Sequence, residues 1–294
     1  MTATIDPKLV TQTAKELYIR ALKVLPPDVK AALARAHERE RHPRAREILG
    51  VMLKNVEVAE TRGLLVCQDT GTPVYKLRIG RGLAYDGPAL LAAIVEGVKQ
   101  ATLEHPLRSS VCHPIDRTNP QTNTGHRIPM VDVEFLEESG YVELKMMPKG
   151  SGSENMSFLK MLAPADGLNG IKRFVLECVV NAGGKPCPPT LVGIGIGGTS
   201  DLAMKLAKEA IWRPVGSPNP DPAIAALEAE LLEAVNALGL GPMGLGGDTT
   251  ALAVQIEYAH THITQNPVAV TLQCWRGERA MARIYPDGRV EHGF

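Results

Sequence analysis

A thiol and a carboxylic acid lie two residues apart in the segment Val66-Cys67-Gln68-Asp69-Thr70-Gly71-Thr72-Pro73. The apolar run from Leu64 to Val66 predicts a short strand that ends in a Gly/Thr/Pro turn. Such a turn directs consecutive side chains around one bend, so a metal-binding sulfur and an acid can face the same pocket. Free cysteines are also among the most buried residue types, which leaves open a structural Cys67 beside a turn-forming Asp69.

Two more cysteines are expected in or beside loops. Cys187 lies in a Gly/Pro-rich segment, and Cys274 follows the apolar run from Val268 to Leu272. Their wide separation from Cys67 differs from the closely spaced pairs of zinc ribbons and from the compact ferredoxin motif. Three scattered loop thiolates are compatible with an iron-sulfur cluster that is held by three cysteines and keeps one iron open.

The other candidate metal ligands have simpler interpretations. Cys178 lies in an apolar helical pattern and is expected in the core. Cys112 and His113 are adjacent, and adjacent side chains rarely point the same way, so a shared metal site is the weaker reading. His260 and His262 share a face at a strand end, without a third ligand nearby in the sequence.

Composition indicates an ordinary globular protein. The chain has 294 residues with 32 basic and 32 acidic groups, and this balance gives no reason to expect a nucleic-acid or membrane partner. No apolar run approaches the roughly 20 residues that span a bilayer, and the N-terminus lacks a signal-peptide pattern, so we expect a cytoplasmic protein. The odd number of cysteines, 5, argues against a disulfide framework.

Hydrophobic periodicity predicts a mixed α/β fold. We expect a helical N-terminal region at 1–62, containing three helices, followed by a single α/β domain at 63–294 whose Gly-rich loops surround the site. The runs 131–135 and 141–147 are predicted to form a hairpin. Further helices are expected at 86–104, 167–182, 200–211 and 222–238, and further strands at 74–79, 191–196, 251–258, 268–272 and 281–285.

Four glycine-rich segments interrupt the second half of the chain. The segment from Gly193 to Ser200 follows a predicted strand and precedes a predicted helix, as a phosphate-binding loop does. Its spacing matches neither the P-loop nor the dinucleotide-binding motif. Carboxylate binding and close packing of a helix on a strand are therefore equally good explanations. The four segments are 149–155, 182–189, 193–200 and 241–250.

Taken together, these motifs resemble the alpha subunit, or N-terminal half, of class I fumarate hydratases and L(+)-tartrate dehydratases, which are iron-sulfur hydro-lyases. The resemblance extends over nearly the whole chain. It rests on six ordered motifs: Cys67-Gln68-Asp69-Thr70-Gly71-Thr72, Asn123-Thr124-Gly125, Lys149 to Ser157, Cys187-Pro188-Pro189, Gly244 to Thr250 and Cys274-Trp275. It implies a 4Fe-4S cluster with one open iron, ligated by Cys67, Cys187 and Cys274.

The resemblance also assigns roles around that cluster. An open, Lewis-acidic iron helps to expel the hydroxyl of a 2-hydroxy diacid, and Asp69 would protonate it. Gln68 would bind a substrate oxygen, Arg108 would clamp a carboxylate, and Gly150 would offer its backbone N–H. The Gly-Ser-Glu-Asn and Leu-Gly-Gly motifs favour fumarate hydration to (S)-malate, with L(+)-tartrate or mesaconate as alternative substrates.

In this family the remaining catalytic groups belong to a beta subunit. The resemblance therefore implies a beta-subunit partner and a heterotetramer built on an alpha-alpha dimer. Two other classes stay open from the residues: a non-catalytic scaffold subunit and a zinc hydrolase using Cys112, His113, His260 and His262. Retention of Asp69 and of the three loop cysteines argues against the scaffold.

Overall fold

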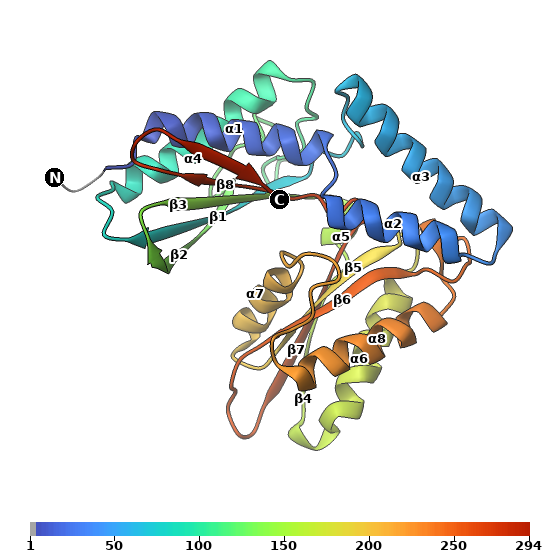
Figure 1. Cartoon of the computed structure of the whole chain (residues 1–294). Helices are drawn as coiled ribbons and strands as arrows, with labels where there is room; N and C mark the ends of the chain where they lie inside the picture. Colours follow the sequence, from blue (N-terminus) through green and yellow to red (C-terminus); the bar gives the residue numbers. More distant parts are fainter. Residues whose placement is uncertain (1–3) are drawn as a thin grey trace. The chain divides into compact units, whose positions relative to one another are not determined.

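The computed structural model describes residues 4–294 and divides the chain into two compact units. The first unit combines the described part of Met1–Pro26 with Val58–Gly150 and Glu278–Phe294. The second combines Pro27–Glu57 with Ser151–Gly277. Both units contain helices and a mixed sheet, which confirms the predicted α/β class (Figure 1). The expected boundary between 62 and 63 stays a prediction.

The first unit is built on a five-stranded sheet in the order β2-β1-β3-β8-β9. Helices α1 (Pro7–Lys23) and α4 (Gly87–Glu104) pack together over one face of it. They approach closely at Gly97, where a Cβ atom would lie 2.5 Å from the carbonyl oxygen of Thr11. The strands are β1 (Thr72–Arg81), β2 (Met130–Ser139), β3 (Val142–Lys149), β8 (Ala280–Ile284) and β9 (Val290–Gly293).

Strand β1 shows how alternation separates the two faces of this sheet. Tyr75, Leu77 and Ile79 point into the core beneath α1 and α4. Lys76 and Arg78 point to the opposite face, where both pair with Glu134 of β2. The period of two predicted for this segment is therefore confirmed.

The predicted hairpin between 131–135 and 141–147 is wrong, although both strands exist. Strand β1 lies between them, parallel to β2 and antiparallel to β3. Strands that follow each other in the sequence usually pair, and the short connection reinforced that expectation. Here β1 and not β2 borders β3, and the N–H of Gly80 in β1 donates to the carbonyl of Tyr141, just before β3, at 3.1 Å.

The second unit contains a four-stranded sheet in the order β4-β7-β5-β6. Helix α7 packs on one face, and α6 and α8 pack on the other (Figure 1). The strands are β4 (Ser157–Leu162), β5 (Thr190–Ile196), β6 (Ala251–Tyr258) and β7 (Asn266–Gln273). The helices are α2 (Pro27–Arg39), α5 (Ser151–Glu154), η1 (Pro164–Asp166), α6 (Gly167–Ala182), α7 (Ser200–Ala210), α8 (Pro222–Ala237) and η2 (Pro242–Gly244).

Glycines of β5 explain one of the glycine-rich segments. A Cβ at Gly195 would lie 1.9 Å from the carbonyl oxygen of Ala203, and one at Gly193 would lie 2.2 Å from that of Ala207. These two positions face α7, whereas Val192 and Ile194 face the core under α6 and α8. Close packing of a helix on a strand therefore accounts for Gly193 and Gly195, whereas Gly197 and Gly198 follow β5 with φ values of 85° and 67°.

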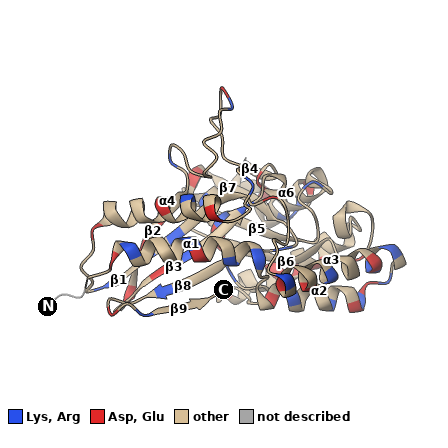
Figure 2. Ribbon diagram, turned by 90° about the horizontal axis from the view of Figure 1, so that it is seen from above, with Lys and Arg blue, Asp and Glu red and all other residues tan. Residues whose placement is uncertain are grey.

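The three predicted N-terminal helices are confirmed as α1, α2 and α3 (Pro43–Arg62). Helix α3 begins in the second unit, and its last turn belongs to the first. Both blue and red positions occur along α2 and α3 in Figure 2, and α2 also buries Val29, Ala32, Leu33 and Ala36, as expected for helices with one solvated face. Within residues 4–294, every helix is too short or too polar to cross a bilayer.

Candidate active site in two parts

The segment around Cys67 is a loop and not the end of a strand. Leu64 donates its N–H to the carbonyl of Ala59 in the last turn of α3, and Val66 donates to Leu22 of α1. These two N–H groups therefore bond to helices and not to a strand, and β1 begins only at Thr72. The strand predicted at 64–66 is therefore wrong.

Backbone hydrogen bonds shape the turn that follows Cys67. The N–H of Asp69 donates to Cys67 Sγ at 3.5 Å, and the N–H of Gly71 donates to Asp69 Oδ1 at 3.0 Å. The second bond is an Asx turn, in which the carboxylate closes its own loop. Gly71 has a φ of 65°. A Cβ there would lie 2.8 Å from the backbone nitrogen of Lys149. Only glycine fits this position.

Arg108 is fixed beside the same turn through its backbone. Its carbonyl oxygen accepts from Thr70 Oγ1 at 2.7 Å and from Asn123 Nδ2 at 3.0 Å, while its side chain is exposed. The buried Gly150 follows Lys149, against which Gly71 packs. Within the first unit, the structure thus brings the loop of Gln68 and Asp69 close to the backbone of Arg108 and the end of β3.

Asn123 is the central residue of this arrangement. It is fully buried, has a φ of 53°, and donates to Arg108 O and to Thr102 Oγ1. It also accepts from the N–H of Ser110 at 2.7 Å. The sequence placed Asn123 in a motif without giving it a role, because nothing local indicates that its partners are backbone groups of a distant loop.

We expect Asn123→Ala to lower the free energy of unfolding by about 3 kcal/mol, because it leaves buried backbone groups without partners and removes a residue that tolerates positive φ. Chemical denaturation followed by circular dichroism measures this loss. Gln12→Ala, which removes an exposed amide of α1 in the same unit, should change stability by less than about 0.5 kcal/mol. Equal stability of the two variants would contradict the prediction.

In the second unit, sheet register places Cys187 and Cys274 together. Strands β5 and β7 are antiparallel with Leu191 opposite Gln273, so the residues before β5 meet those after β7. The carbonyl of Cys187 accepts from the N–H of Trp275 at 3.2 Å. Cys187 is exposed and has a φ of 56°, and Cys274 is 8% exposed. Two of the three predicted ligands are therefore neighbours, and Cys67 belongs to the other unit.

The remaining thiols and histidines have ordinary surroundings. Cys178 is 1% exposed in α6, and burial raises the pKa of its thiol to about 12, which confirms a core residue. His113 pairs with Asp116 at 3.0 Å, and His262 Nδ1 lies 2.9 Å from Thr264 Oγ1. Taken unit by unit over residues 4–294, neither the Cys112-His113 pair nor the His260-His262 pair joins a group of three metal-ligating side chains.

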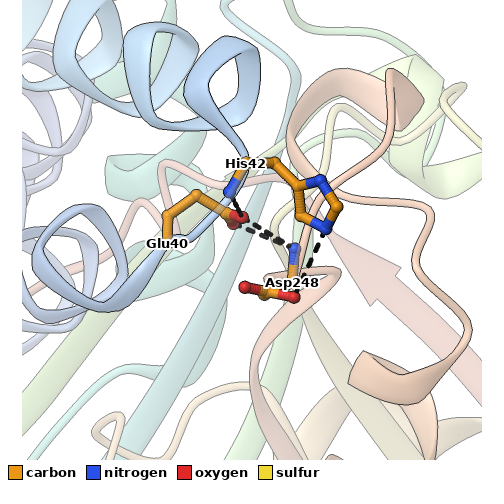
Figure 3. Close-up of side chains that lie close together, drawn as sticks. All are labelled: Glu40, His42 and Asp248. Carbon is orange, nitrogen blue, oxygen red and sulfur yellow. Dashed lines mark hydrogen bonds and ion pairs between the residues drawn. The ribbon is translucent and has the colours of Figure 1, made fainter.

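The sequence did not anticipate one cluster of ligand-type side chains, Glu40, His42 and Asp248 (Figure 3). Both oxygens of Glu40 already accept the N–H of Asp248 at 3.0 Å. Both oxygens of Asp248 accept from Arg41 at 2.8 Å, and these bonds keep the pKa of Asp248 well below its usual range. Because the carboxylates are engaged by the protein's own donors, this cluster is a structural connection and not a metal centre.

Comparison with known proteins shows which family the sequence of this chain matches. A family model described as fumarate hydratase (fumerase) matches residues 11–283. A Methanocaldococcus jannaschii protein provisionally named L(+)-tartrate dehydratase subunit alpha is 48% identical over 283 residues, covering 96% of this chain and 99% of its own. The L(+)-tartrate dehydratase subunit alpha of Escherichia coli strain K12 is 32% identical over 268 residues, covering 91% and 88%.

Proposed function

This chain belongs to the fumarate hydratase family of hydro-lyases, and on that premise we propose that it is the alpha subunit of an L(+)-tartrate dehydratase. The observation that carries the proposal is similarity along nearly the whole chain to proteins with that name, from an archaeon and from bacteria. These names favour tartrate, the alternative substrate, over the fumarate that the glycine-rich motifs favoured. Fumarate remains the second candidate because the family model carries its name.

The chemistry is the same for both substrates. Water leaves a dicarboxylate that has a hydroxyl on one carbon and a proton on the next. Tartrate carries a second hydroxyl, so its dehydration gives an enol that becomes the 2-keto acid oxaloacetate, whereas malate gives fumarate. The two activities therefore share an acid for the departing hydroxyl and donors for two carboxylates, and they differ in how the second hydroxyl is accommodated.

The donor set fits a 4Fe-4S cluster held by Cys67, Cys187 and Cys274. All three thiols lie in loops, Cys187 and Cys274 are neighbours, and Cys67 Sγ accepts an N–H bond of the kind that tunes cluster sulfurs. When bound, a cluster with one open iron supplies a Lewis acid for the substrate hydroxyl.

The chain's own residues supply the other functions. Asp69 moves a proton to the departing hydroxyl, from a carboxyl group that the Asx turn orients. Gln68 and Arg108 have exposed side chains that can bind substrate oxygen and carboxylate. Gly150 offers its backbone N–H to the same ligand. These roles are part of the proposal.

A beta subunit completes the proposed enzyme, as the names of the relatives imply by specifying an alpha subunit. We further propose that two alpha chains form a dimer that binds two beta chains. The base that removes the proton from carbon would then come from the partner.

The test is a substrate comparison with the anaerobically reconstituted alpha-beta enzyme. We expect oxaloacetate formation from L(+)-tartrate with a kcat/KM at least about tenfold above that for hydration of fumarate. Groups of the site that hydrogen-bond the second hydroxyl of tartrate would be left without a partner when fumarate is bound. A reversed preference would assign the enzyme to fumarate, and mesaconate is the third substrate to measure.

The isolated alpha chain serves as the control for subunit dependence. Reconstituted alone, it should bind iron and sulfide but show no turnover above the background, because the carbon base is absent. Full activity of the isolated chain would refute the requirement for a beta subunit.

A further inference from the structure

Glu40, the residue after α2, is an acid buried at 3% exposure among backbone donors. Its carboxylate accepts the N–H groups of Asp248 at 3.0 Å and of His42 at 3.1 Å (Figure 3). It also accepts the N–H of Thr249 at 3.3 Å. A buried carboxylate that is satisfied by three backbone donors fixes the segments that carry them. Glu40 therefore joins the end of α2 to the segment 241–250, which we call the glycine loop.

The glycine loop has little freedom around this anchor. A Cβ at Gly247 would lie 2.6 Å from Ala45 Cβ and 3.2 Å from Glu40 Oε2. The loop's other end contacts the Cys187 segment: Met243 donates its N–H to the carbonyl of Pro188 at 2.8 Å, and a Cβ at Gly244 would lie 2.6 Å from the Cα of Gly184.

The Cys187 segment is itself strained and depends on these contacts. Cys187 has a φ of 56°, which a residue with a Cβ atom rarely adopts. Such a conformation persists only where the surroundings determine it. The surroundings here are the bond from Cys187 N–H to Gly184 O, the bond from Trp275 N–H to Cys187 O, and the glycine loop that packs on Gly184 and Pro188.

We propose that Glu40 is a positioning residue for Cys187. Its carboxylate holds the glycine loop, and the glycine loop holds the cysteine segment in its left-handed conformation. The effect of Glu40 on cluster binding rests on the proposed function. The effect of Glu40 on the conformation of the Cys187 segment does not, so the two effects can be tested separately.

The experiment compares Glu40→Gln with Arg41→Ala. Glutamine keeps the size of the side chain but replaces one carboxylate oxygen by an NH₂ group, which cannot accept a bond from a backbone N–H. Arg41→Ala is the control, because Arg41 is exposed and its side chain binds the glycine loop only through Asp248. Hydrogen exchange reports on the amides of Asp248 and Thr249, and alkylation of the cluster-free chain, read by peptide mass, reports on Cys187. Iron content after anaerobic reconstitution gives the third measurement.

For Glu40→Gln we expect exchange at Asp248 and Thr249 to rise roughly ten- to hundredfold, because the bonds lost are to a charged group. The alkylation rate of Cys187 should change severalfold and the iron content should fall, while Arg41→Ala stays near wild type in all three. Faster exchange with unchanged alkylation of Cys187 would overturn the proposal. If Glu40→Gln does not fold, Glu40→Asp, whose side chain is shorter by one methylene, should show the same changes in smaller degree. A Glu40→Asp variant with wild-type exchange, alkylation and iron content would also overturn the proposal.

Absence of iron from the wild-type chain would refute the cluster and leave the positioning role to be decided by exchange and alkylation.

Discussion

Replacing any one of Cys67, Cys187 and Cys274 by serine is expected to abolish retention of the iron-sulfur cluster and to lower turnover of the alpha-beta enzyme by at least about a thousandfold. The Lewis acid that the cluster supplies is worth several kcal/mol of transition-state stabilisation, and each 1.4 kcal/mol is about a factor of ten in rate. Serine differs from cysteine by one atom and is a poor ligand for iron in this class of site.

The measurement is iron, sulfide and zinc content after anaerobic purification, together with the visible absorbance of the cluster. Cys112→Ser is the matched control, because it removes a half-buried loop thiol of the first unit that is outside the proposed ligand set. Stoichiometric zinc in the wild-type protein, or cluster absorbance that survives all three substitutions, would contradict the assignment.

The assignment of the proposed ligands to different units of the chain sharpens this experiment. Cys187 and Cys274 are neighbours through the bond from Trp275 to Cys187, whereas Cys67 lies in the first unit. If the three act as one ligand set, then each single variant should lose as much iron as the triple variant. Additive, partial losses would instead indicate independent metal sites.

The second large effect is expected for Asp69→Asn in the alpha-beta enzyme, with a fall in kcat of roughly 10² to 10⁴. The structure makes this substitution informative. Asp69 Oδ1 accepts the N–H of Gly71, and an asparagine oxygen can accept the same bond, so the Asx turn is retained while the acid is lost. The expected result is a low kcat with a nearly unchanged KM and a normal iron content.

Asp69→Ala separates the two functions of this carboxylate. It removes the proton donor and the bond that closes the turn, so we expect it to lose iron as well as activity, because Cys67 lies in the same turn. If Asp69→Asn retains more than about a tenth of wild-type kcat, Asp69 is a structural residue and another group protonates the departing hydroxyl.

Much of the fold could be predicted from periodicity and helix-capping residues. Asp86 and Asp221, each followed within two residues by proline, cap α4 and α8 as their sequences indicate. Strand order was not predictable in the same way. The segments of β2 and β3 carry no mark of the partner that each prefers, and the pairing of β1 with both is decided by the packing of the whole sheet.

For the candidate site, the sequence supplied a set of proposed residues but not the contacts that hold them. The resemblance named Cys67, Asp69 and Arg108, and their assigned roles remain predictions. The backbone bonds from Thr70 and Asn123 to Arg108 depend on a fold that no local pattern encodes. Glu40 is an extreme case, since it sits in a run of charged residues that is typical of a solvated surface, and yet it is buried.

The division of the chain into interleaved segments has a consequence for its synthesis. Strand β3 pairs with β8, where Val142 lies opposite Ile284, so the sheet of the first unit lacks an interior strand until synthesis has passed Ile284. The second unit is encoded between these two strands and also needs the early segment Pro27–Glu57. We therefore expect neither unit to complete its fold as an isolated continuous fragment, and nascent chains to need protection from aggregation until β8 and β9 emerge.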